Sequence, residues 1–599
     1  MVQHSTSDKP SNYDLYQQAA FNQPAYYPLH PSVPSTLYHP IATWMGRLIL
    51  PSMEQRQVVK GVLMEVHHAP APHQDLVGQI VNLRWSNTPQ LQARLQAVRQ
   101  DIHFSHQAQT SQRQGNIHPL RLDRWQQVDP LESLAGARPN DDLVVRLRDP
   151  VRIEAANSTD LRPTLSIEWE PVQITGRFYA LVKILRPASE GSDRFHVVHF
   201  DRTSRQFNGA EEVVRIPQVI ANKHGVFPST SRAIEQSPPN PTGWYIYGAW
   251  NRREMFVVQA IVPHALLRLQ PDEVISGQKA AFYYIKKQSW HEPATQKGQI
   301  SSVFLNPQKQ VLHQAINYWQ EGDRALVLHV YGGIGGQKKE PAAMAGPYFG
   351  HFAFGIAQVV CDPLSNELRF EIAYHQIYTQ NTDGIVAGAQ AWCRYMGDRQ
   401  WGWLGTRPTS DIVIKLDVLE QPFVVDGVKY SVLDMVTCQL ETMAARYRSG
   451  DGTGATFAGP ANNCAQDSNQ ALYATLKQLE RALQTETDGR QKRQLRDREA
   501  RAFKQLAALS QSLKQELMPL GKARPDWEKK QPNLGIRLDA RPFTQLRRGI
   551  ESWRTMLPRF ASDTLARIFL EQGASMWVLR TNQVGGNDPE IAPIAPMTL

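Results

Sequence analysis

The stretch 350–378 constrains the fold more than any other part of the chain. Two runs that alternate apolar with small or polar side chains, HFAFGIAQVV and LRFEIAYHQIY, flank the turn-forming segment CDPLSNE. This pattern predicts an antiparallel hairpin. With the turn centred near Leu364–Ser365, opposed residues have numbers that sum to about 729. His351 then lies opposite about residue 378 and His375 lies within one diagonal step, so the hairpin predicts two imidazoles at the same end.

A cysteine directly precedes a predicted helix in GPANNCAQDSNQALY. The first turn of a helix presents unpaired N–H groups and the positive end of the helix dipole, which lower a thiol pKa and favour an oxyanion. We therefore predict Cys464 as a nucleophile, His351 as its base and His375 as the group that orients the base. The predicted neighbours of this site are Asn463, Gly350, Asp383 and Asp467.

The order of these residues is informative, because the histidine comes first and the cysteine helix last. Gly350–His351, His375 and Asn463–Cys464 in this order resemble the circularly permuted papain-like (NlpC/P60) superfamily. The resemblance implies that a G-H strand carries the base, that the next strand carries a polar orienting group, and that NC opens the nucleophile helix. The long insertion between His375 and Cys464 departs from the pattern. The resemblance implies hydrolysis of a peptide or amide bond.

A second resemblance rests on the phrases YGGIGG, GHFAFGIAQVV, GWLGTRP and CAQDSNQALY. They look like those of a cyanobacterial family catalogued as predicted proteases of the Abi (CAAX) class. That label refers to intramembrane metalloproteases with an acidic pair and histidines on membrane helices, whereas this sequence has no run of 18 apolar residues. The resemblance supports a peptidase, and it implies that a membrane part would follow Leu599.

The chain has 599 residues, which exceeds the size of one typical domain. We predict a multidomain protein with β-rich barrels or sandwiches in its N-terminal half. The C-terminal half is predicted to hold an α+β permuted papain-like domain and a helical hairpin. The predicted parts are a flexible arm (1–40), three β-rich modules (41–153, 154–234 and 235–307, the last opened by a Pro-rich linker), the α+β catalytic candidate (308–475), the helical hairpin (476–520), a helical part (521–580) and a linker-like tail (581–599).

Composition sets the expected surroundings of the protein. The formal net charge of +9 is spread along the chain, so nucleic acid is not indicated as a partner. The four cysteines contain no CxxC pair, which argues against a disulfide framework and favours a reducing interior. No secretory signal opens the sequence. We expect a cytoplasmic protein, membrane-associated if a segment follows residue 599, that acts on a peptide- or amide-containing substrate and needs no cofactor.

Three alternatives to this hydrolase are a nucleotide site, a zinc site and an inactive scaffold. A P-loop is rejected, because no Ser or Thr follows Lys338–Lys339 and Pro341 interrupts a helix there. Zinc is a second possibility, since His351, His375 and Cys464 are good zinc ligands that an aspartate or water could complete. Asp383 is the aspartate in question. In the third alternative the papain-like part is inactive and the β modules bind a partner as a scaffold.

Overall fold

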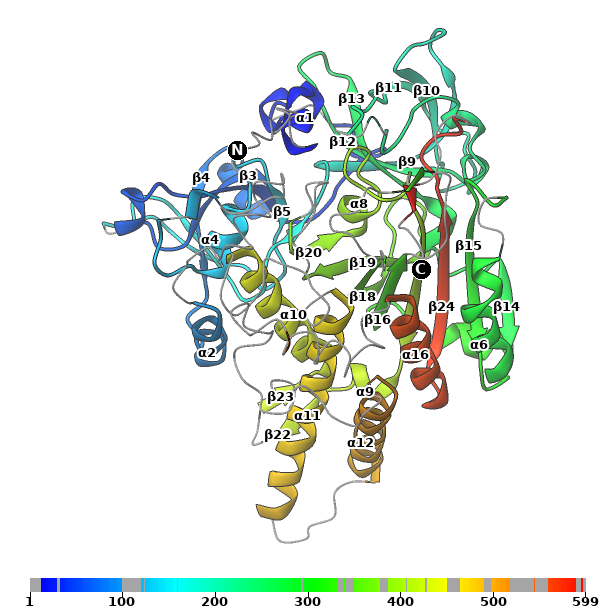
Figure 1. The fold of residues 1–599 in the computed structure, drawn as a ribbon. Coiled ribbons are helices and arrows are strands. Elements are labelled where there is room, and N and C mark those ends of the chain that lie inside the picture. The colour runs from blue at the N-terminus through cyan, green and yellow to red at the C-terminus, as the bar shows by residue number, and fades with distance from the viewer. Residues whose placement is uncertain are drawn as a thin grey trace, which may run out of the picture.

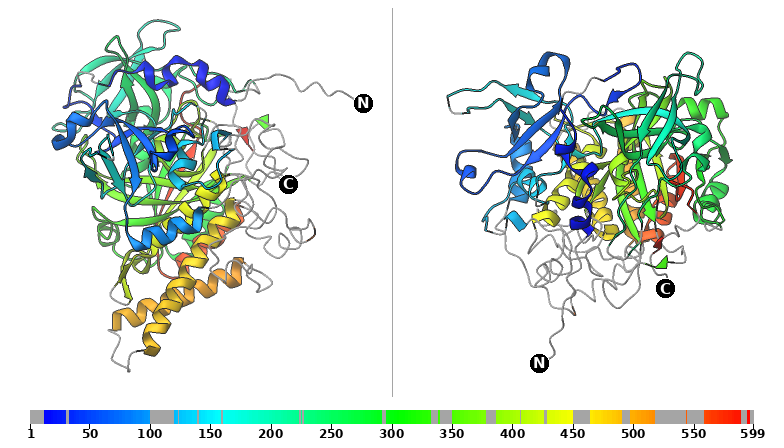
Figure 2. Two further views of the ribbon diagram at one scale, coloured as in Figure 1. Left: turned by 90° about the vertical axis from the view of Figure 1, so that its left-hand side faces the viewer. Right: turned by 90° about the horizontal axis from the view of Figure 1, so that it is seen from above.

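A computed structural model gives the fold of the chain (Figures 1 and 2). The structure describes residues 12–29, 33–99, 120–331, 338–339, 350–377, 386–449, 464–489, 497–517, 543, 558–588 and 594–595. Within these ranges it leaves out positions 123, 139, 159, 223, 224, 226, 292–294, 406, 426 and 427. The described chain is β-rich, with helices, and it is built from several parts.

One sheet runs through most of the chain and has 15 strands. Its spatial order is β14 (Glu273–Ser276), β15 (Ile300–Asn306), β24 (Ser575–Asn582), β21 (Pro408–Lys415), β16 (Arg324–Tyr331), β18 (His351–Cys361), β19 (Leu368–Gln376), β20 (Gly388–Ala391), β8 (Val172–Gln173), β5 (Val144–Arg146), β2 (Met45–Ile49), β3 (Val62–His68), β4 (Ile80–Trp85), β7 (Thr164–Ile167) and β6 (Arg152–Glu154). The parallel bridge between Gln390 and Gln173 joins the C-terminal strands to the N-terminal ones. Strands from all three predicted β-rich modules and from the predicted catalytic candidate therefore lie in one continuous sheet.

A second sheet closes into a small barrel. Its order is β1 (His39–Pro40), β9 (Phe178–Pro187), β10 (Arg194–His199), β11 (Glu211–Arg215), β13 (Phe256–Pro263) and β12 (Trp244–Trp250). An additional pairing of β12 with β9 completes the ring. Because the ring is closed, the five strands β9 to β13 have neighbours on both sides and leave no free edge between them.

The central strands separate two cores, because successive side chains of a strand point to opposite faces. On one face Leu328, Phe352 and Phe354 pack with the helices, and on the other Val327 and Ala357 pack with the barrel. Figure 1 shows the helical layer below these strands and the barrel above them. The helices of this layer are α6 (Gln278–Lys286), α10 (Val432–Ser449), α11 (Cys464–Gly489), α12 (Asp497–Leu517) and α16 (Pro558–Glu571).

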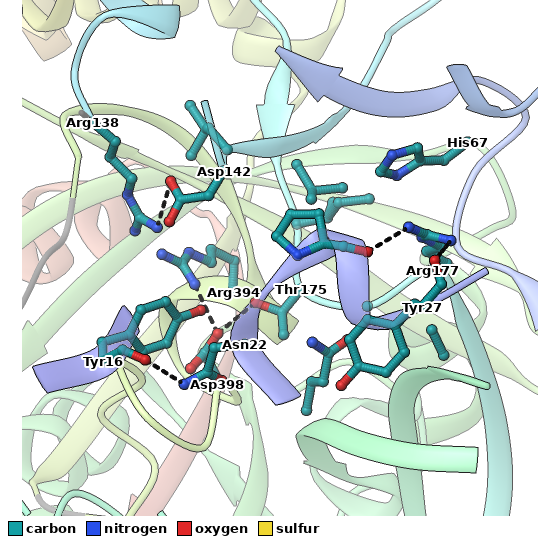
Figure 3. A pocket seen from close by; sticks show the side chains of 17 residues that line it. Tyr16, Asn22, Tyr27, His67, Arg138, Asp142, Thr175, Arg177, Arg394 and Asp398 are labelled. Atoms are coloured by element: carbon teal, nitrogen blue, oxygen red, sulfur yellow. Dashed lines mark hydrogen bonds and ion pairs between the residues drawn. The ribbon is translucent and has the colours of Figure 1, made fainter. Parts of the chain in front are cut away.

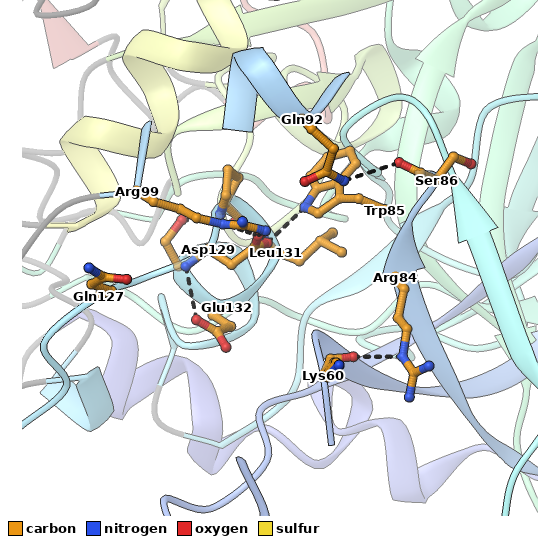
Figure 4. A network of polar contacts seen from close by, with 12 residues as sticks. Lys60, Arg84, Trp85, Ser86, Gln92, Arg99, Gln127, Asp129, Leu131 and Glu132 are labelled. Carbon is orange, nitrogen blue, oxygen red and sulfur yellow. Dashed lines mark hydrogen bonds and ion pairs between the residues drawn. The ribbon is translucent and has the colours of Figure 1, made fainter. Parts of the chain in front are cut away.

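The N-terminal strands have their own core and two short helices, α2 (Pro89–Val98) and α4 (Pro130–Ala135). The Asp129 carboxylate caps α4 by accepting a hydrogen bond from the Leu131 N–H at 2.9 Å. The Glu132 carboxylate accepts one from the Asp129 N–H at 2.9 Å. The Trp85 indole N–H donates to the same aspartate at 2.7 Å (Figure 4). This capping box satisfies donors that the first helical turn leaves unpaired.

Three predicted boundaries differ from the structure. Within the expected flexible arm, residues 12–29 form α1 (Asn12–Gln18) and two short 3₁₀ turns, and Phe21 and Tyr27 are buried against barrel residues. This segment is ordered against the barrel because burial of the large aromatic side chains of Phe21 and Tyr27 is favourable. The expected Pro-rich linker contains Asn240, which is buried and bonds Ile184 at 3.0 Å, so β12 and β13 belong to the same barrel as β9.

The third difference lies near the C-terminus. The segment expected to be helical up to residue 580 ends in β24, which pairs with β15 on one side and β21 on the other. The two helices expected before it are present as α11 and α12, which contact each other. Among the described residues, no helix is both long enough and apolar enough to cross a membrane.

Candidate functional site

The predicted hairpin has the predicted register. β18 and β19 pair antiparallel, and Phe354 lies opposite His375, whose numbers sum to 729. His351 is the first residue of β18 and follows Gly350, which has a φ of 78°. A positive φ favours glycine at this position, so the chain can turn sharply into the strand.

The imidazole of His351 lies among aromatic rings on the barrel side of the sheet. Its centroid is 5.2 Å from that of Trp403, 5.9 Å from that of Tyr331 and 6.4 Å from that of Tyr395. The residue is buried. Burial, with a further effect of nearby His329, lowers the pKa of His351 to about 3, so the imidazole is neutral at physiological pH.

Gln376, and not His375, contacts the predicted base. The Nε2 atom of His351 is 2.7 Å from the Gln376 side-chain oxygen. An amide oxygen only accepts, so Nε2 carries the proton and Nδ1 is the nitrogen able to take one up. The predicted orienting role of His375 is corrected on this point, because Phe354 and His375 share one face and His351 is on the other.

His375 belongs to the helix-side core. Burial, followed by the charges of Arg148 and Arg324, lowers its pKa to about 3. Its Nδ1 atom has no hydrogen-bond partner among the described residues. The register contained the signal for the correct choice, since a diagonal step on one face moves two residues, from 378 to Gln376.

Cys464, which the sequence places just before a helix, is the first residue of α11, and it is buried. The thiol lies against backbone N–H groups of Phe352 and Ala465, which favour its thiolate, but burial is the larger effect and raises the pKa of Cys464 to about 11. Asp467 follows one turn later, is buried, and accepts a hydrogen bond from the Tyr447 hydroxyl. The resting thiol of Cys464 and the resting imidazole of His351 are therefore both neutral.

The thiol meets β18 one residue from His351. The helix α11 contacts β18, and the pairing of β18 with β19 begins only at Phe354. Among the described residues, the Phe352 N–H is met on that side by Cys464 of α11. Cys464 and Phe352 share the helix-side core, whereas the His351 ring is on the barrel side, so the two groups are brought to the same strand end from opposite layers.

A buried polar network that the sequence did not reveal lies next to His351. His329 of β16 has its Nδ1 atom 2.6 Å from an Asp411 oxygen and its Nε2 atom 3.0 Å from the Tyr395 hydroxyl. The Tyr374 hydroxyl donates to the other Asp411 oxygen at 2.6 Å. The His329 ring is 6.4 Å from that of His351. The contact between His329 and Asp411 depends on the pairing of β16 with β21, in which the two residues lie opposite each other.

The zinc ligand set is not brought together. His351 and His375 lie on opposite faces, and no group of three His, Cys, Asp or Glu residues in the described parts of the chain is placed to hold a metal ion. The predicted neighbours Asn463 and Asp383 lie outside the described residues. Of the other thiols, Cys393 is buried, and Cys361 and Cys438 are partly exposed.

Comparison with known proteins gives no further guide: no family model, curated protein or solved structure matches the chain.

Proposed function

We propose that the protein is a cysteine-dependent hydrolase that cleaves an amide, peptide or ester bond, with Cys464 as nucleophile, His351 as base and Gln376 as the group that orients the base. In this proposal the C-terminal part has the residue order of the circularly permuted papain-like superfamily. Gln376 on the strand after His351 fits the polar orienting position of that order.

One observation carries the proposal. The thiol at the start of α11 lies against the backbone N–H of Phe352, the residue that follows His351. His351 is in turn fixed through Nε2 by Gln376, which leaves Nδ1 as the basic nitrogen of the ring. A nucleophile, a base and a third group that orients the base are the parts that thiol acyl transfer requires.

The chemistry follows from these roles. His351 Nδ1 takes the thiol proton as the sulfur attacks the carbonyl carbon, and the carbonyl oxygen becomes an oxyanion. The N–H groups of Phe352 and Ala465 that favour a thiolate are suited to stabilise negative charge at this point. The protonated His351 then gives its proton to the leaving amine or alcohol, and a thioester forms on Cys464. Water, deprotonated by His351, attacks the thioester and releases the acid and the free thiol.

The resting charges set a condition on this reaction. Because burial raises the thiol pKa and lowers the imidazole pKa, the pair does not form a thiolate–imidazolium ion pair at rest. Proton transfer therefore accompanies attack on the carbonyl, as in general base catalysis. A probe that requires such assistance tests the proposal better than a reagent that alkylates any thiolate.

A peptide-like vinyl sulfone, which reacts slowly with unassisted thiols, is the appropriate probe. We expect it to modify Cys464 in the native protein and to lose at least about a hundredfold in rate in His351→Asn, because the base contributes roughly that much. The rate of Cys464 modification in Gln376→Ala should lie between the rates in the wild-type protein and in His351→Asn. Modification is located by mass spectrometry of the digested protein.

Cys361→Ala is the matched control, because Cys361 ends the same strand that His351 begins and is the more exposed thiol. This variant should be labelled at Cys464 as fast as the wild-type protein. If Cys361 reacts faster than Cys464, or if His351→Asn leaves the rate at Cys464 unchanged, the protein is not a hydrolase of this kind. Such a result would favour the alternative in which the papain-like part is inactive and the β modules bind a partner.

A further inference from the structure

A small polar cavity lies away from the cysteine site, between the N-terminal segment and the two sheets. Its volume is about 50 Å³. The N-terminal segment contributes Tyr16, Asn22 and Tyr27 to the wall, so these residues enclose the cavity from one side. The other walls come from β3, from the chain between α4 and β5, from the chain before β9, from β12 and β13, and from the chain around α8 (Trp392–Tyr395) (Figure 3).

The walls carry more positive than negative charge. Arg138, Arg177 and Arg394 face Asp142 and Asp398, so three positive groups meet two negative ones and the balance is one positive charge. Arg394 is 2.7 Å from Asp398, and Arg138 is 3.7 Å from Asp142. Both aspartates are therefore already engaged by the two arginines nearest to them.

Arg177 supplies the charge that is left over. Its guanidinium donates to the carbonyls of Pro28 at 2.8 Å, Tyr27 at 3.4 Å and Pro24 at 3.5 Å. No carboxylate of the described residues lies within ion-pair distance of it, although the residue is buried. The Glu65 carboxylate acts on Arg177 only from beyond ion-pair distance and is already bonded to Arg47 and His67. The buried guanidinium of Arg177 therefore stays incompletely compensated, which favours binding of an anion.

His67 adds a requirement on the chemistry of that anion. Its Nε2 atom is 3.0 Å from a Glu65 oxygen, and the residue is buried. A carboxylate only accepts, so the proton is on Nε2 and Nδ1 is a hydrogen-bond acceptor. Nδ1 has no partner among the described residues. Figure 3 shows this ring beside Arg177 at one end of the cavity, with the Arg138–Asp142 and Arg394–Asp398 pairs at the other.

We infer that the cavity is a binding site for a small oxyanion that also carries a hydroxyl group, such as hydrogen carbonate or hydrogen phosphate. The anionic oxygens would meet the N–H groups of Arg177, and the hydroxyl would donate to Nδ1 of His67. A water needs about 10–15 Å³ of such volume, so a cavity of about 50 Å³ accepts an ion of four or five heavy atoms. The inference does not depend on Cys464 or on the reaction proposed for it.

Calorimetric titration of the full chain tests the inference. Sodium hydrogen carbonate, phosphate, acetate and chloride are compared at pH 7.5 and constant ionic strength. Hydrogen carbonate or phosphate should bind at one saturable site, at least about tenfold more tightly than acetate. The reason is that acetate has no hydroxyl at this pH and would leave His67 unpaired. Arg177→Gln should abolish binding of every oxyanion, and His67→Phe should remove the preference over acetate.

Arg215→Gln is the matched control, because Arg215 also touches the N-terminal segment, at Tyr26, but does not line the cavity. It should bind as the wild-type protein does. If Arg177→Gln does not fold, His67→Phe decides alone. Equal affinity for acetate and the hydroxyl-bearing anions, or no saturable binding beyond that of chloride, overturns the inference. So does binding that persists in Arg177→Gln.

Discussion

Replacing Arg448 by Met should destabilise the contact between α10 and the N-terminal strands more than any surface substitution. The Arg448 guanidinium forms a two-point ion pair with Glu170, at 3.0 and 2.6 Å. It also donates to the carbonyls of Ala387 at 2.8 Å and Pro130 at 3.2 Å, and to the Ser133 hydroxyl at 3.2 Å. The side chains of Arg448 and Glu170 are 1% and 2% exposed, so water cannot replace these bonds.

The expected cost follows from what remains after the change. Arg448→Met leaves the Glu170 carboxylate buried without its partner, which typically costs about 3–5 kcal/mol of unfolding free energy. Replacing both members, as Arg448→Met with Glu170→Leu, removes the unpaired charge and should cost much less, about 1 kcal/mol or below. The double variant should therefore be more stable than the single variant Arg448→Met.

The assay must report on this contact, since a chain of this size need not unfold in one step. Native-state hydrogen exchange of peptides from α4 and α10 measures the local opening free energy, and urea unfolding gives the global one. Arg567→Met is the control, because Arg567 makes ion pairs with Glu516 and Glu571 at the surface and should change stability by less than about 1 kcal/mol. If Arg448→Met costs no more than Arg567→Met, or if the double variant is the weaker one, the reasoning from burial is wrong.

Three further predictions address the site and the barrel. The alkylation rate of Cys464 by iodoacetamide should rise with pH from 7 to 10 without a plateau, because its pKa is raised to about 11; a rate that stays constant from pH 7 to 10 would indicate a thiolate already formed in an ion pair. His375 binds its proton in the unfolded chain below about pH 6.5 but in the folded chain only near pH 3, so stability falls as the pH drops through this window. His375→Leu should thus lose about 2 kcal/mol less than the wild-type protein between pH 7 and pH 5 in urea unfolding, and parallel losses would contradict this. Gly248→Ala should destabilise the barrel by about 1–3 kcal/mol or more in thermal unfolding, because an added methyl group would lie 1.9 Å from the Val257 carbonyl oxygen; an unchanged melting temperature would show that the strands separate freely.

The β18–β19 hairpin shows which features local sequence determines and which it leaves open. The turn residues between two apolar runs were sufficient to predict the pairing of Phe354 with His375. Which side chain shares a face with His351 depends on the register to within one residue, because a step of one residue reverses the face. His375 lies one residue away and points to the opposite face, whereas Gln376 satisfies the two-residue periodicity and contacts His351.

Other parts of the fold could not be predicted, because they depend on partners distant in the chain. β24 enters the sheet between β15 and β21, and its pairing partners precede it by more than 150 residues. The Arg448–Glu170 pair and the His329–Asp411 pair are also long-range contacts. The N-terminal segment has no periodicity of its own and therefore predicts a flexible arm, whereas only contact with the barrel accounts for the burial of Phe21 and Tyr27.

The candidate site depends on the packing of two cores, the barrel-side core and the helix-side core, which lie on opposite faces of β18. The His351 ring is fixed by Gln376 and by the aromatic rings of the barrel side, whereas Cys464 is fixed by α11 in the helix-side core. Neither core alone sets the position of the thiol relative to the imidazole, so a change in either core alters it. A substitution that loosens the helical layer should slow labelling of Cys464 while the contact between His351 and Gln376 persists. Such a separation distinguishes a site assembled between layers from one that is built on a single rigid element, where both properties would change together.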